Sequence, residues 1–130
     1  MERNEKTRAL LAAFGCALAY LLAGKALTAV LPQVPEEAAR MWAFVHRCAA
    51  APIVEELVFR GIIQQLARPL GERQAVALQA VLFAVQHRGP AGMAYALVCG
   101  LVLGTIRSRT GSVWPGMLLH TLNNLLVFAA

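Results

Sequence analysis

Long apolar runs separated by short charged clusters dominate this sequence. The runs cover residues 9–31, 41–66, 74–87, 91–106 and 112–130. Crossing a bilayer core of about 30 Å takes roughly 20 helical residues, so most of these runs are long enough to span a membrane. The pattern predicts an all-α fold, a polytopic transmembrane helical bundle of about five membrane helices. The run at 74–87 is short for a crossing, and we expect it to be tilted or shielded by its neighbours.

Prolines mark where the predicted helices end or bend. The segment 32–40 holds two prolines and is expected to end the first helix and form a loop. Pro52 lies inside the second run, where the loss of one backbone hydrogen bond should kink the helix. The last run should be broken at Pro115 and Gly116. Because no repeat and no Gly- or Ser-rich linker divides the chain, we expect one transmembrane domain over residues 1–130.

Basic residues gather between the apolar runs. The clusters are Arg3 with Lys6 and Arg8, Arg68 with Arg73, and Arg107 with Arg109. Five alternating crossings place all three clusters on one side of the membrane, which the positive-inside rule makes the cytoplasm. The N-terminus is therefore expected to be cytoplasmic. The first run exceeds the roughly 7–15 apolar residues of a signal peptide, which favours a membrane anchor over a cleaved leader.

Composition supports lipid as the solvent of this chain. Of the 130 residues, 58% are hydrophobic and 15% are charged, against about 25% charged in soluble domains. The formal net charge of +5 does not indicate nucleic-acid binding, because no basic stripe is interleaved with aromatic residues. Cys16, Cys48 and Cys99 lack the paired spacing of a zinc or redox motif, and we expect them to be core residues.

Three ionisable residues interrupt the second apolar run. Glu55, Glu56 and Arg60 lie where each charge costs at least ~2.5–3.5 kcal/mol on insertion scales, which calls for a compensating role. Glu56 and Arg60 share a helical face at this spacing and are expected to pair. Glu55 points about a third of a turn away and is the candidate to take a proton from water. The alternative is structural, a buried ion pair that fixes helix packing beside one protonated glutamate.

Two histidines and an asparagine on other runs are candidates to complete a site. His87 ends the third run, and His120 lies one turn before Asn124 in the last run. Donors from His120 and Asn124, which share a face, could converge on the oxygen that becomes negative in a tetrahedral intermediate. His87 has a plainer alternative, because a histidine at a helix end often meets water. Zinc is a further alternative, although no H-E-x-x-H spacing is present.

Three motifs in order give the sequence a family resemblance. They are PIVEELVFRG at 52–61, FAVQH at 83–87 and HTLNN at 120–124, each on a separate apolar run. Together they resemble the CPBP (Abi) family, the CAAX-prenyl-protease-like group of intramembrane glutamate endopeptidases, and its small prokaryotic members in particular. The segment 104–115 also resembles the approach to that family's last motif. The resemblance covers about residues 51–126, which would form the catalytic core.

The resemblance implies a metal-independent hydrolysis that uses no cofactor. Glu55 with His87 would activate water to attack a peptide carbonyl, and the Glu56 ion pair would support them. His120 and Asn124 would stabilise the oxyanion. The substrate would be a membrane-embedded or lipid-anchored peptide or protein, and the enzyme would be a multi-pass protein of a prokaryotic cell (inner) membrane.

Other functions fit parts of the pattern. A non-catalytic membrane binder, such as a bacteriocin-immunity or scaffold protein, would use the same motifs for packing and recognition. A proton-coupled carrier also uses intramembrane carboxylates, but paired repeats are absent from this sequence. Only one clear helix precedes the glutamate helix, so a homo-oligomer or another partner is an open way to close the substrate chamber.

Overall fold

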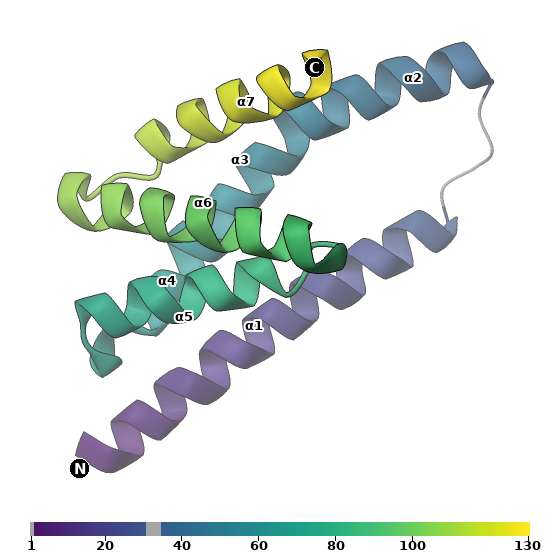
Figure 1. Ribbon diagram of the computed structural model, residues 1–130. Coiled ribbons are helices and arrows are strands. Elements are labelled where there is room, and N and C mark those ends of the chain that lie inside the picture. Colours follow the sequence, from purple (N-terminus) through teal and green to yellow (C-terminus); the bar gives the residue numbers. More distant parts are fainter. Residues whose placement is uncertain (1, 31–34) are drawn as a thin grey trace.

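The structure, a computed structural model, describes residues 2–30 and 35–130, and this part of the chain is helical without strands. The elements are α1 (Glu2–Val30), α2 (Glu36–Val45), η1 (His46–Ala50), α3 (Ala51–Glu55), η2 (Glu56–Ile63), α4 (Gln64–Leu66), η3 (Arg68–Leu70), α5 (Glu72–Ala84), α6 (Gly89–Thr110) and α7 (Trp114–Ala129). The five elements from α2 to α4 follow one another without a break and form one long helix, the glutamate helix, over residues 36–66 (Figure 1). With α1, α5, α6 and α7 it makes up the predicted all-α bundle of five helices, which is confirmed.

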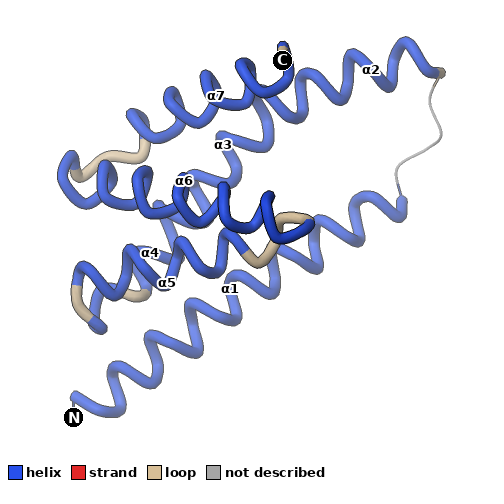
Figure 2. Tube along the Cα trace, viewed as in Figure 1, coloured by secondary structure: helices blue, strands red, loops and turns tan. Residues whose placement is uncertain are grey.

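The short connections after the glutamate helix each turn at a glycine. Gly71, Gly89 and Gly111 have φ angles of 113°, 72° and 70°, a region that glycine enters without side-chain strain. The loops around them are brief (Figure 2). As a result α5, α6 and α7 fold back on the glutamate helix with few residues outside helices.

Wide helical turns lie close to the two glutamates, and Glu56 begins one of them. The segments η1 and η2 are π-helical, and the N–H of Gln64 donates to the carbonyl of Phe59, five residues back. Figure 1 shows the glutamate helix changing direction between α2 and α3, which confirms the kink predicted at Pro52. Such turns occur often at functional sites, because they leave backbone groups free for other partners.

The burial pattern is the reverse of that in a water-soluble protein. Glu56, Arg60, Gln79 and His120 are buried inside the bundle. Large apolar side chains are exposed on all five helices, among them Leu11, Ile53, Val81, Val98 and Leu118. Both α1 and α6 are individually long and apolar enough to cross a membrane. An apolar exterior around a polar interior is the arrangement that a lipid environment favours.

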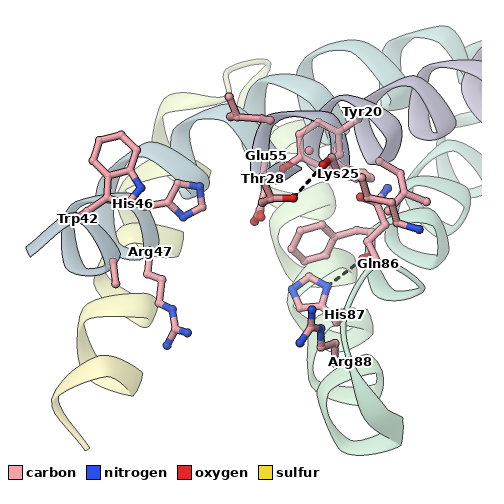
Figure 3. A pocket seen from close by; sticks show the side chains of 16 residues that line it. Tyr20, Lys25, Thr28, Trp42, His46, Arg47, Glu55, Gln86, His87 and Arg88 are labelled. Carbon is pink, nitrogen blue, oxygen red and sulfur yellow. Dashed lines mark hydrogen bonds between the residues drawn. The ribbon is translucent and has the colours of Figure 1, made fainter. Parts of the chain in front are cut away.

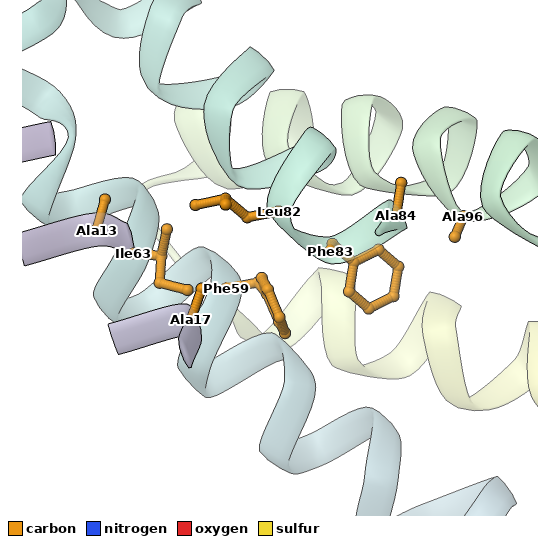
Figure 4. Close-up of a cluster of buried hydrophobic side chains, with 8 residues drawn as sticks. All are labelled: Ala13, Ala17, Phe59, Ile63, Leu82, Phe83, Ala84 and Ala96. Atoms are coloured by element: carbon orange, nitrogen blue, oxygen red, sulfur yellow. The ribbon is translucent and has the colours of Figure 1, made fainter. Parts of the chain in front are cut away.

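A small apolar cluster holds α1 against the glutamate helix. Its members are Ala13, Ala17, Phe59, Ile63, Leu82, Phe83, Ala84 and Ala96 (Figure 4). The alanines of α1 bring that helix close to Phe59 and Ile63, as small residues do between membrane helices. The cluster reaches from α1 to Phe83 of α5, which is also a wall of the site described below.

Helices α5 and α6 pack most closely at glycine. A Cβ atom added to Gly100 would lie 2.8 Å from the Cα of Ala80, so no larger residue fits there without a shift. The amide of Gln79 donates to the carbonyl of Gly100 at 2.7 Å and stays buried at this crossing. Gly100 therefore lies at a close helix crossing, whereas Gly92 of the same helix faces open space.

Two predicted interruptions and one helix end are wrong. The glutamate helix begins at Glu36, so most of the loop predicted at 32–40 is helical, while residues 31–34 lie outside the described part of the chain. Pro115 does not break the last helix, because it lies in the first turn of α7, where a missing N–H costs no hydrogen bond. Helix α5 ends at Ala84, which leaves His87 in the turn to α6.

Candidate active site

A buried ion pair lies at the centre of the bundle. Nη1 of Arg60 is 3.1 Å from Oε1 of Glu56, and both side chains are fully buried, so the predicted pair is confirmed. Within residues 2–30 and 35–130, no atom meets the guanidinium in hydrogen-bond geometry. Its other close neighbour is Phe83, whose ring centroid lies 4.5 Å from Cζ of Arg60. The arginine is therefore held by charge and by the aromatic face.

His120 of α7 bridges the two glutamates. Its Nδ1 lies 3.0 Å from Oε1 of Glu56, and its Nε2 lies 3.6 Å from Oε2 of Glu55. A carboxylate accepts, so the contact with Glu56 places a proton on Nδ1. Glu55 is thus within reach of an imidazole that the fold brings from a position 65 residues further along the chain (His120 minus Glu55).

A cavity of about 660 Å³ opens beside Glu55. Its walls come from the second half of α1, from α2 with η1, and from the turn between α5 and α6. Glu55 and His87 both line it, and Figure 3 shows them on different sides of the open space. Nδ1 of His87 lies 3.0 Å from the carbonyl oxygen of Phe83, so Nδ1 carries the proton and a neutral ring keeps Nε2 as an acceptor.

Asn124 has a partner on another helix. Its Nδ2 donates to the carbonyl oxygen of Arg47 at 2.8 Å and so joins α7 to η1. Its Oδ1 accepts from Asn123 at 3.4 Å, and Asn123 in turn accepts a hydrogen bond from the hydroxyl of Tyr95. Asn124 is predicted from its sequence position to join His120 around an oxyanion, and this role stays a prediction.

Phe83 is a site residue that the sequence analysis misses. Its ring centroid lies 4.6 Å from that of His87 and 5.9 Å from that of His120, both in edge-to-face geometry. The same ring packs on Arg60. One aromatic side chain thus contacts residues from three separate motifs. Its only signal in the sequence is its place at the start of the second motif, one turn before His87.

The comparison with known families decides the classification of the chain. A family model described as Type II CAAX prenyl endopeptidase Rce1-like matches residues 37–126. The chain belongs to this family. No curated protein and no solved structure matches the sequence.

Membership makes this Rce1-like chain a CAAX-protease-like peptidase at the level of the family. The matched region covers more than two thirds of the 130 residues and includes every residue that the sequence analysis places in the site. Together with the apolar helices α1 and α6, it identifies a membrane protein.

Proposed function

We propose that this Rce1-like chain is an intramembrane glutamate endopeptidase that hydrolyses a peptide bond of a membrane-embedded or lipid-anchored substrate without a metal or other cofactor. The observation that carries the proposal is the position of Glu55. Its carboxylate lines an open cavity, 3.6 Å from an imidazole of His120, and a second imidazole, His87, lines the same cavity. An acid and a base beside a space for water and peptide are the groups that such a hydrolysis needs.

In the proposed reaction a water molecule in the cavity attacks the carbonyl carbon of the substrate. Glu55, assisted by Nε2 of His87, takes the proton that water loses as the new C–O bond forms. The negative oxygen of the tetrahedral intermediate is stabilised by an N–H of Asn124 and by His120 as an imidazolium, in which Nε2 carries a proton in addition to the one that Nδ1 donates to Glu56. Collapse breaks the C–N bond, and the proton passes from Glu55 to the departing amine, which leaves a carboxylic acid and an amine as products.

Glu56 and Arg60 support this reaction from the buried side. The Glu56 carboxylate holds Nδ1 of His120 at 3.0 Å, which fixes the orientation of the ring and points Nε2 toward Glu55. Arg60 balances the charge of Glu56.

We place the protein in a prokaryotic inner membrane with a cytoplasmic N-terminus, since the basic clusters then obey the positive-inside rule. A second copy of the chain is an open way to enlarge the substrate chamber.

Glu55→Gln tests the proposal. The probe is an internally quenched peptide that ends in a farnesylated cysteine and three further residues, the substrate type of the family, added to the full chain in nanodiscs. Because an amide cannot take the proton, we expect Glu55→Gln to lose cleavage while abundance and thermal melting match those of the parent. The matched control is Glu72→Gln, which changes a half-exposed acid at the start of α5 and should keep the parental rate.

Two outcomes would count against the peptidase. Full cleavage by Glu55→Gln would remove this residue from the chemistry. A parent chain that binds the peptide, yields no product, and binds it equally well as Glu55→Gln would instead favour a non-catalytic membrane binder.

A further inference from the structure

The hydrogen bond between Asn124 and Arg47 meets a specific defect in the glutamate helix. In η1 the N–H of Ala51 donates to the carbonyl of His46, five residues back. In the same register the next carbonyl, that of Arg47, would accept from residue 52. This residue is Pro52, which has no N–H. Nδ2 of Asn124 donates to that carbonyl at 2.8 Å and so supplies the donor that the proline lacks.

This bond lies between two other contacts that join α7 to the glutamate helix. At one end the ring centroids of Phe44 and Phe128 lie 5.3 Å apart. At the other end His120 contacts Glu55 and Glu56. The three α7 positions, 120, 124 and 128, follow one another at intervals of one turn on one face of the helix. A change at Asn124 therefore acts directly on the position of His120.

We propose that Asn124 is a positioning residue whose amide replaces the N–H missing at Pro52 and thereby holds His120 against the two glutamates. Without this amide the Arg47 carbonyl has no donor within its own helix, so the helix must shift or find another partner. The Asn124 amide has a second N–H, and this N–H is the donor that the proposed mechanism directs at the oxyanion. The two roles can be separated, because only the first depends on Pro52.

The test is a double-mutant cycle between Asn124→Ala and Pro52→Ala. Pro52→Ala restores a backbone N–H at residue 52, so the Arg47 carbonyl finds a donor inside its own helix. With the farnesylated peptide as probe, we expect Asn124→Ala to lower kcat at least about tenfold in the parent and at most about threefold in the Pro52→Ala background. Pro90→Ala, which changes the first-turn proline of α6, is the matched control and should leave the tenfold loss in place.

The cycle separates positioning from direct catalysis. A residue that acted only as an oxyanion donor would lose the same factor in both backgrounds, and that result would overturn the proposal. If Asn124→Ala alone does not accumulate, its recovery in the Pro52→Ala background is the expected result, since the amide is then dispensable. Failure to accumulate in both backgrounds would overturn the proposal.

A second readout needs no enzymatic activity. Arg47 and Cys48 form the one Arg–Cys pair in the sequence, so carbonyl-¹³C arginine with ¹⁵N cysteine yields a single NMR signal that reports the Arg47 carbonyl. We expect this signal to shift in Asn124→Ala and to stay in place in Leu122→Ala, an exposed position on the same helix. An unmoved signal in Asn124→Ala would overturn the proposed hydrogen bond between Asn124 and the Arg47 carbonyl. The double-mutant cycle in kcat rests on the proposed peptidase function. The NMR signal tests the hydrogen bond to Arg47 even in a chain that cleaves nothing.

Discussion

Removing one partner of the buried pair formed by Arg60 and Glu56 should destabilise the bundle far more than removing both. Each side chain is fully buried, and the two are 3.1 Å apart. Loss of one partner leaves a buried charge, which typically costs about 3–5 kcal/mol. The destabilisation by Arg60→Met should lie near the lower limit, about 3 kcal/mol, because Glu56 keeps His120 as a partner at 3.0 Å. The destabilisation by Glu56→Gln should approach about 5 kcal/mol, because Glu56 is the one acid paired with Arg60 among the described residues.

The free energy of unfolding can be measured by titrating SDS into the protein in mixed micelles and following helicity by circular dichroism. A loss of about 3 kcal/mol lowers the folding equilibrium constant by more than a hundredfold. The double variant Glu56→Gln/Arg60→Met carries no unpaired charge at these positions, so it should lose less than Glu56→Gln alone. Arg68→Met is the control, since it removes an exposed pair with Glu72 whose nitrogen and oxygen are 3.4 Å apart. Exposed pairs contribute about 0–1 kcal/mol.

Two results would refute this reasoning. If Arg60→Met costs no more than Arg68→Met, burial does not make the pair costly to break. If the double variant loses the sum of the two single losses, Glu56 and Arg60 act independently and the pair has no energetic meaning.

Two further predictions follow from the geometry of the site. Gly116→Ala places a Cβ 2.6 Å from Oε2 of Glu56, a carboxylate held by Arg60 and His120, so we expect at least a tenfold loss of turnover. Gly92→Ala, whose added Cβ meets open space, is the control. Equal rates in the two variants would contradict the contact between Gly116 and Glu56. A chelator such as EDTA should leave cleavage of the farnesylated peptide unchanged, because the proposed mechanism activates water with Glu55 and His87; a loss of rate that zinc restores would contradict it.

Local features of the site are those that the sequence predicts well. The pairing of Glu56 with Arg60 depends only on a spacing of four residues along one helix, and the structure has it. The kink at Pro52 follows from the missing N–H of proline in the same way. The number of helices follows from the apolar runs, because a backbone in lipid must satisfy its hydrogen bonds within helices. Helix ends are less certain, as Pro115 shows, since proline interrupts a helix but also begins one.

By itself the sequence determines the membrane helices, the order of the three motifs and the residue types that chemistry requires. The tertiary structure alone decides which of these residues meet. His120 contacts Glu56 across 64 positions, and Asn124 contacts Arg47 across 77. Such pairs depend on how far each helix is rotated and displaced against its neighbours. That rotation is set by packing at places such as Gly100 against Ala80, and a periodic pattern along one helix carries no information about it.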